Sequence, residues 1–179
     1  MDMTKLYSTP EREKILVFLL YNPKPKITMR QIAKKLSISH SQVHKYITML
    51  KKMRIVKDME LIETPFVRSL RLTQNIIRLE KVKVAKILRK RVKDITGIGI
   101  FGSWANGSNT STSDVDIWIK VRKEPELITI AEARRELEKI GAGVDFTILT
   151  EEKIRGHMER NPPFYFSLVH SMVLWGEGI

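Results

Sequence analysis

The chain has 179 residues, of which 42% are hydrophobic and 29% are charged, proportions that are typical of folded proteins and exclude a largely disordered chain. It contains no cysteine, which excludes disulfides and thiolate metal sites, and it shows neither a secretory signal nor an apolar run long enough to span a bilayer. We therefore expect a cytoplasmic protein of two small domains that does not enter a membrane.

The formal net charge of +12 is divided unevenly along the chain. Residues 1–93 carry 23 Lys and Arg against 7 Asp and Glu, a net charge of +16, whereas residues 94–179 carry 9 against 13, a net charge of −4. This asymmetry predicts a domain boundary near Lys93. A basic block of this kind favours a polyanionic partner such as nucleic acid, and a solvated lysine-rich surface is the alternative.

Three helices are predicted in the first half of the basic block. Apolar positions at helical spacing predict the first over residues 9–21. Thr28 and Gln31 have the spacing of a capping box, which predicts that a second helix begins there. After a short turn, a third helix is expected from about Ser39 to Met53.

Two helices joined by a short turn allow the second helix to lie in a major groove and present its side chains to base edges. The stretch "TMRQIAKKLSISHSQVHKYITMLKKMRIV" resembles the helix-turn-helix of winged-helix DNA-binding proteins. The resemblance implies that duplex DNA is a partner and is compatible with a homodimer, although similar modules also serve protein contacts alone. The DNA-binding residues that we expect are His40, Ser41, Gln42, His44, Lys45 and Lys51.

Two further segments complete the expected basic half. Apolar, β-prone residues at 55–62 and 66–73, on either side of a Thr64-Pro65 turn, predict the strands of a wing, so that a winged helix-turn-helix DNA-binding domain would occupy residues 1–73. Residues 74–93, "QNIIRLEKVKVAKILRKRVK", predict a basic linker helix. Its cations could contact a phosphate backbone, the acidic surface of a dimer partner, or only water.

The stretch "FGSWANGSNTSTSDVDIWI", residues 101–119, contains no Lys or Arg, in contrast to the basic first half. Because side chains alternate along a strand, Asp114 and Asp116 are expected to share one face of the strand that follows the polar loop. Like charges so close are tolerated when a divalent cation such as Mg²⁺ lies between them. Gly102 would let a phosphate approach the backbone, and Ser103 offers a hydroxyl and an amide. This pattern favours phosphoryl or nucleotidyl transfer; a turn before a capped edge strand is the alternative.

The same residues carry a resemblance to a known family. "GSWANGSNTSTSDVDIWI" looks like the Gly-Ser, spacer, Asp-x-Asp signature of the DNA polymerase beta-like nucleotidyltransferase superfamily, in its minimal branch. The superfamily has a third carboxylate on a later strand, which Asp145 in "GAGVDFTIL" matches. Before it, helical spacing predicts a helix over 125–140 that buries Leu127, Ile130, Ala133, Leu137 and Ile140. The resemblance covers residues 94–179. It implies an α+β protein in which a nucleotidyltransferase domain, a mixed β-sheet flanked by helices, follows the winged-helix domain.

The resemblance also implies roles for residues that match the signature. The implied enzyme transfers a nucleoside monophosphate from a nucleoside triphosphate such as ATP to a hydroxyl acceptor and releases pyrophosphate. Its catalytic residues, which would also hold two Mg²⁺ ions, are Asp114, Asp116 and Asp145. The nucleotide-binding residues that the signature implies are Gly102, Ser103, Asn106, Gly107 and Ser113.

Asn106 departs from the family pattern, because many members have Arg at this position. Either a cation from elsewhere in the chain compensates, or turnover is weak. Two other functions therefore stay open. One is a nucleotide-responsive, DNA-binding transcriptional regulator with a weak or inactive transferase domain. The other is an antitoxin that pairs with a separate helical protein, because members of the minimal branch often resemble antitoxins.

Overall fold

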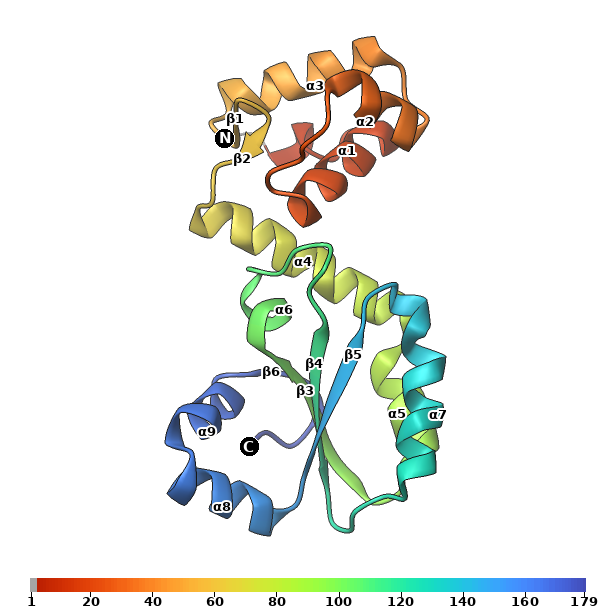
Figure 1. The fold of residues 1–179 in the computed structure, drawn as a ribbon, viewed down its shortest axis with the longest axis vertical. Coiled ribbons are helices and arrows are strands. Elements are labelled where there is room, and N and C mark those ends of the chain that lie inside the picture. The colour runs from red at the N-terminus through yellow and green to blue at the C-terminus, as the bar shows by residue number, and fades with distance from the viewer. Residues whose placement is uncertain (1–2) are drawn as a thin grey trace. The chain divides into compact units, whose positions relative to one another are not determined.

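The structure, a computed structural model, describes residues 3–179 of the chain (Figure 1). These residues form two compact units, which divide between Arg71 and Leu72.

The N-terminal unit contains the three predicted helices. The capping box is present, since the Thr28 side chain accepts a hydrogen bond from the Gln31 amide and the Gln31 side chain accepts one from the Thr28 amide. Buried Ile, Leu and Val side chains of all three helices form one core, which Tyr46 joins by donating a hydrogen bond from its hydroxyl to the Leu6 carbonyl (2.9 Å). The elements are η1 (Met3–Lys5), α1 (Pro10–Tyr21), α2 (Met29–Leu36), α3 (His40–Lys52), β1 (Val56–Lys57) and β2 (Glu60–Leu61).

The wing is a short hairpin. Strands β1 and β2 pair antiparallel, and the two residues between them, Asp58 and Met59, both have positive φ angles (47° and 73°). Positive φ at both central residues is the geometry of a tight turn whose twist matches that of the flanking strands. The hairpin therefore lies within the first of the two segments that the sequence assigned to the wing.

The expected second wing strand at 66–73 is wrong, because these residues lie in helix α4 (Pro65–Val82). Thr64 Oγ1 accepts a hydrogen bond from the Val67 amide (3.2 Å), and Pro65 occupies the first helical position. A threonine cap followed by proline is a favoured start of a helix. The Thr-Pro pair begins a helix here instead of turning a hairpin.

Helix α4 also contains a buried cation. Arg71 is 1% exposed, and it donates from Nε to the Leu20 carbonyl (2.5 Å) and from Nη2 to Glu63 (2.6 Å). A guanidinium that is removed from water needs such partners, because an unpaired buried charge is strongly destabilising. The first two turns of α4 are therefore part of the N-terminal unit.

The predicted linker helix at 74–93 is two helices. Helix α4 ends at Val82, Lys83 adopts a left-handed conformation (φ 61°), and α5 (Val84–Arg91) follows. A left-handed residue interrupts the helical hydrogen-bond pattern, so it sets a break at this position.

The C-terminal unit is a four-stranded mixed sheet in the order β5-β4-β3-β6. Strand β3 pairs antiparallel with β4 and β6, whereas β4 and β5 are parallel, which confirms the expected mixed sheet with flanking helices. The strands are β3 (Ile95–Phe101), β4 (Val115–Val121), β5 (Val144–Leu149) and β6 (Met172–Gly176). The remaining elements are α6 (Gly102–Asn106), α7 (Leu127–Leu137), η2 (Glu138–Ile140), α8 (Glu151–Arg160) and α9 (Pro162–Val169).

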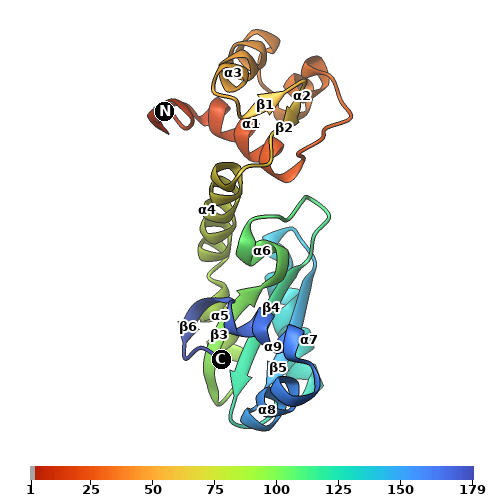
Figure 2. The same ribbon diagram turned by 90° about the vertical axis from the view of Figure 1, so that its left-hand side faces the viewer.

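Strand β4 separates two apolar layers. Ile117 and Ile119 face the core that α5 and α7 cover, whereas Trp118, between them, packs with Leu168 of α9 and Ile154 of α8 on the other face. Figure 1 shows α5 and α7 together on one face of the sheet, and α8 and α9 on the other. In both views α6 lies at one end of the sheet and α8 at the opposite end (Figure 2).

Helix α7 and the 3₁₀ turn that follows it correspond to the helix expected over 125–140. Ala133, Leu137 and Ile140 are buried as their spacing predicts, but Leu127 is 89% exposed, so its expected burial is wrong. Leu127 is the first residue of the helix and lies a turn before the part that packs on the sheet. Within residues 3–179, no helix combines the length and the apolar composition that crossing a bilayer would require.

Candidate active site

Strand β3 runs directly into α6 at Gly102, where the two halves of the sequence signature meet. Gly102 has a φ of +66°, and a Cβ atom at this position would lie 2.5 Å from Oδ2 of Asp116. Only glycine avoids both the backbone strain and the steric overlap. The Gly-Ser step and the second aspartate of the signature are therefore in direct contact.

The three predicted catalytic carboxylates come from adjacent strands. Asp116 pairs in register with Asp145 of the parallel strand β5 and with Phe101 of β3. Asp114 precedes β4, and its Oδ1 occupies the space that a Cβ at Gly143 would need. Two glycines thus leave room for two carboxylates at one end of the sheet.

The carboxylates at this end repel one another. Burial, followed by the negative charges of Asp145 and Asp114, raises the pKa of Asp116 above its ordinary value. Asp114 and Asp145 are exposed, whereas Asp116 is half-buried. The structure brings together like charges that only a cation, or protonation, relieves.

The other residues of the signature shape the loop. Asn106 Oδ1 accepts a hydrogen bond from the Ser108 amide (2.9 Å), and Ser113 Oγ accepts one from the Thr110 amide (2.9 Å). Gly107 ends α6 with a φ of +71°, and its amide donates to the Ser103 carbonyl. The side chain of residue 106 therefore holds a turn here and supplies no positive charge.

Sequence reasoning did not identify the buried amides that anchor this loop. Asn75 and Asn109 are both fully buried, and each donates to the other's side-chain oxygen (2.8 and 3.2 Å). Asn75 also donates to the Trp104 carbonyl (2.8 Å). An asparagine in a polar loop carries no sign that it is buried, and its partner lies 34 residues away in α4.

Sequence reasoning also did not identify Arg134, the cation beside the carboxylates. Arg134 Nη1 lies 3.7 Å from Asp145 Oδ1, and its guanidinium carbon lies 5.9 Å from the centre of the Phe146 ring. Asp114, Asp145 and Arg134 line a cavity of about 340 Å³, and Arg134 is the one Lys or Arg in its lining. Arg134 appears in the sequence only as one of two adjacent arginines on an amphipathic helix.

The carboxylate group meets part of what Mg²⁺ requires of its ligands. Within residues 3–179, no three His, Cys, Asp or Glu side chains converge closely enough to enclose a metal ion as they stand. The chemistry of the donors nevertheless fits, because Mg²⁺ takes oxygen ligands and commonly keeps several waters beside one or two carboxylates. Burial and, after it, repulsion by Asp145 and Asp114 raise the Asp116 pKa, and a bound divalent cation would relieve the repulsion.

The predicted DNA-binding residues lie on α3. All six are exposed, and the rings of His40 and His44 lie 6.4 Å apart, centroid to centroid. Gln42 has a second role, because its side chain accepts a hydrogen bond from the Ser39 hydroxyl (2.8 Å) in a capping box at the start of the helix. Its side-chain oxygen is therefore engaged within the helix.

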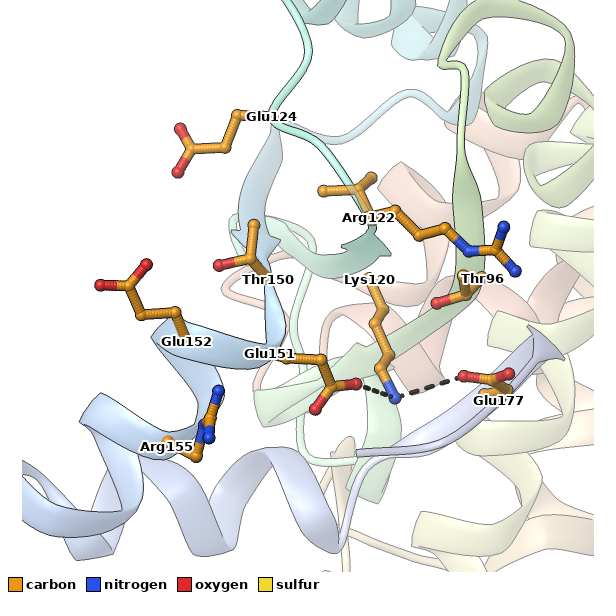
Figure 3. Close-up of a pocket in the computed structure, with 10 residues that line it drawn as sticks. Thr96, Lys120, Arg122, Glu124, Thr150, Glu151, Glu152, Arg155 and Glu177 are labelled. Atoms are coloured by element: carbon orange, nitrogen blue, oxygen red, sulfur yellow. Dashed lines mark hydrogen bonds and ion pairs between the residues drawn. The ribbon is translucent and has the colours of Figure 1, made fainter.

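A second cavity lies at the other end of β4 (Figure 3). Lys120 points between two carboxylates there, at 2.9 Å from Glu151 and 3.3 Å from Glu177. Hydrogen bonding to Glu151 outweighs burial and, together with Glu177, raises the pKa of Lys120. At this end of the strand, opposite charges are paired.

Comparisons with known protein families match both units. The family described as "Polymerase beta, Nucleotidyltransferase" matches residues 82–160, and that described as "HTH domain" matches residues 11–64. A protein of Methanocaldococcus jannaschii, provisionally named a protein adenylyltransferase, is 31% identical over 78 residues, which cover 40% of this chain and 90% of that relative.

Two solved structures are similar to part of the chain. The toxin-antitoxin MntA-HpeT, in a mutant form, is matched with a TM-score of 0.41 and 24% identity over 54% of this chain and 72% of that chain. A protein of Sulfolobus solfataricus, provisionally assigned as a nucleotidyltransferase, is matched with a TM-score of 0.39 and 22% identity over 61% of this chain and 92% of that chain.

Proposed function

The chain belongs to the polymerase beta nucleotidyltransferase family and carries a helix-turn-helix domain before its nucleotidyltransferase domain, and from this premise we propose that it is an Mg²⁺-dependent enzyme that acts while bound to DNA. The reaction is transfer of a nucleoside monophosphate from a nucleoside triphosphate to a hydroxyl group. The proposal is supported above all by the contact between Gly102 and Asp116. Asp116 in turn pairs with Asp145 on the neighbouring strand.

The position of Gly102 supports a phosphate cradle beside the carboxylates. Because Gly102 has no Cβ, its backbone lies directly beside the Asp116 carboxylate, and the Ser103 hydroxyl is the next polar group along the chain. The β and γ phosphates of the triphosphate would bind at Gly102 and Ser103. The α phosphate would then lie toward Asp116, which contacts this same glycine.

Asp114, Asp116 and Asp145 would hold the Mg²⁺ ions. The ions would neutralise the phosphate charge and orient the reacting groups when they are bound. Asp114 and Asp145 are exposed, so their side chains can turn toward Asp116 without disturbing the core.

Asp145 would assist the transfer as a proton acceptor. The acceptor oxygen forms a bond to the α phosphorus, and the bond from that phosphorus to the bridging oxygen breaks, so pyrophosphate leaves. The hydroxyl proton passes to the Asp145 carboxylate. The cavity bounded by Asp114, Asp145 and Arg134 offers the acceptor a place next to this carboxylate.

Arg134 would compensate for the uncharged residue at position 106. It lies 3.7 Å from Asp145 and is exposed, so it can move from this carboxylate to a phosphate oxygen when substrate arrives. Asn106 instead holds the turn that follows α6. A cation on α7 would thus replace the one that many relatives carry in the loop.

The test is calorimetric titration with each nucleoside triphosphate, with and without Mg²⁺, followed by an assay of pyrophosphate release. We expect the nucleoside triphosphate to bind only with Mg²⁺, and Asp114→Asn to weaken this binding at least tenfold. Asp116→Asn should slow the release of pyrophosphate at least about 100-fold. Asp94→Asn is the matched control, since Asp94 is an exposed aspartate of the same unit outside the site. Undiminished release in both Asp114→Asn and Asp116→Asn would falsify the proposed chemistry.

The engaged side chain of Asn106 also favours a second candidate, a nucleotide-responsive DNA-binding regulator with weak transfer. This function predicts that a nucleoside triphosphate changes the affinity for duplex DNA, with Asp114→Asn removing the effect. Nucleotide and DNA that bind independently of each other would exclude it.

A further inference from the structure

The cations of helix α5 divide into two groups. Arg91 is structural: its Nε lies 3.0 Å from Glu136 and its Nη1 lies 3.1 Å from Glu132, both on α7. These ion pairs join two helices on the same face of the sheet. The remaining cations of α5 are Lys86, Arg89 and Lys90, which line a pocket.

The second group lines a pocket at the break between α4 and α5, which we name the basic pocket. Its volume is about 540 Å³. The charged residues in its lining are Glu80, Lys83, Lys86, Arg89 and Lys90. Lys83, Lys86 and Lys90 are exposed, and none of the three forms an ion pair within residues 3–179. The pocket therefore presents four cations against one carboxylate.

The helix break explains why this surface is hollow. A run of charges on a straight helix is convex and most often only solvated. Here Lys83 takes a left-handed conformation, and the chain turns inward so that Val84 is 2% exposed. Lys83, Lys86 and Lys90 follow at spacings of three and four residues, which place them on one side of the second helix.

Arg89 is held in place at the pocket by an aromatic ring. Its guanidinium carbon lies 4.2 Å from the centre of the Trp175 ring, on strand β6. Stacking of this kind orients a guanidinium while leaving its edge N–H groups free to bind an anion. One of the four cations is thus positioned before any ligand arrives.

We propose that the basic pocket binds the phosphate backbone of a nucleic acid, so that the nucleotidyltransferase unit makes its own contact with DNA in addition to that of the helix-turn-helix. Lysine and arginine contacts to phosphate fix the position of a protein on a duplex without reading its sequence. An acidic protein is the less suitable partner, because the core of a protein interface is depleted of lysine and rich in apolar area. The apolar residues of this pocket are Val84, which is buried, and Ala85.

The test is the salt dependence of duplex binding by the full-length protein. A fluorescent duplex of about 30 base pairs is titrated at several salt concentrations, with the triple variant Lys83→Ala, Lys86→Ala, Lys90→Ala beside the wild type. Each phosphate contact contributes about 0.9 to the slope of log K against log salt. We expect the slope of the triple variant to be smaller by about 2 to 3. Arg89 is left intact because it packs against Trp175.

A matched control removes the same charge from elsewhere in the unit. Lys123, Arg135 and Lys139 are exposed and form no ion pair in the described part of the chain, and their triple alanine variant should keep the wild-type slope. Equal slopes in the wild type and the pocket variant would overturn the proposal, as would an equal decrease in both triple variants. Absence of any duplex binding by the wild type would overturn it too.

The outcome is separable from that of the proposed reaction. The pocket variant keeps Asp114, Asp116 and Arg134, so its affinity for a nucleoside triphosphate should equal that of the wild type. A decrease in nucleotide affinity without a change in the salt slope would assign the pocket to the nucleotide and overturn the proposal.

Discussion

The two ends of strand β4 differ in how their charges are balanced. At the start of the strand, Asp116 is surrounded by further carboxylates and its pKa is raised by burial and repulsion. At the end, Lys120 lies between two glutamates at 2.9 and 3.3 Å, and its pKa is raised by attraction. The opposite charges at the Lys120 end satisfy one another, whereas the like charges at the Asp116 end repel, so that a bound cation or protonation would relieve them. If the proposed reaction is correct, the Asp116 end of the strand binds substrate and the Lys120 end only supports the fold.

The largest effect is expected for Gly102→Ala. A methyl group would lie 2.5 Å from Asp116 Oδ2, at a φ of +66° that disfavours alanine. We expect pyrophosphate release to fall at least about 100-fold, because displacement of a catalytic group by about 1 Å can cost that much. Gly178→Ala is the control, since its methyl group would lie 3.7 Å from Val173, an ordinary contact. Equal rates in the two variants would show that the cradle is misassigned.

A smaller effect is expected at Arg134, which lies beside the carboxylates. Arg134→Ala should weaken binding of a nucleoside triphosphate about tenfold, equivalent to about 1.4 kcal/mol, through loss of one charge-assisted contact. Arg135→Ala, at the next position of α7, which is also exposed, should leave binding unchanged. Calorimetry of both variants separates the two arginines. If they behave alike, the compensating cation lies elsewhere.

At the other end of the strand, the expected effect is on stability alone. Lys120→Met leaves Glu151 and Glu177 without their cation, and we expect the free energy of unfolding to fall by about 1 kcal/mol in urea titrations at pH 7. Nucleotide binding should not change. Lys123→Met, at an exposed lysine nearby, is the control.

The pH dependence of this difference follows from the direction of the Lys120 pKa shift. The folded-state pKa is raised above the unfolded value, which is about 10.4. The stabilisation by Lys120 is therefore fully present below about pH 10 and is lost as the pH rises through the folded-state pKa. Wild type and Lys120→Met should approach equal stability at high pH. A difference that stays constant from pH 7 to pH 11 would contradict the ion-pair interpretation.

The smallest effect is a gain in stability. Asp116→Asn removes a charge that burial and two neighbouring aspartates disfavour, so the variant should be more stable than the wild type at pH 7, by less than about 1 kcal/mol because the group is partly solvated. Thermal unfolding of the two proteins measures this difference. A lower melting temperature in the variant would show that the Asp116 carboxylate stabilises the fold.

The sequence predicted the parts of this molecule that depend on local signals. The capping box at Thr28, the three helices of the N-terminal unit and the mixed sheet all appear in the structure. Each rests on residues a few positions apart, or on one continuous signature. The prediction of a second wing strand at 66–73 was wrong for a local reason as well. Thr64-Pro65 is compatible with both a turn and the start of a helix, and the structure has the helix.

The remaining features depend on contacts between residues that are distant in the sequence. Arg134 meets Asp145 only because α7 packs beside β5, and Asn75 meets Asn109 across 34 residues. Helix α8 was not predicted from the sequence. Ile154 is its one buried residue, so its sequence shows little of the apolar periodicity that indicates a helix. Contacts of this kind can be predicted only when the packing of the helices and strands is known.

The amide pair of Asn75 and Asn109 has a consequence for shortened forms of the protein. Arg71, which belongs to the N-terminal unit, and Asn75, which anchors the signature loop, lie about one turn apart on α4. A truncated protein that starts at Leu72 would keep Asn75 but place it in the fraying first turn of a helix without a cap. The boundary between Arg71 and Leu72 is thus a poor place to truncate the chain, and a fragment that keeps the signature loop anchored would have to begin at the Thr64 cap.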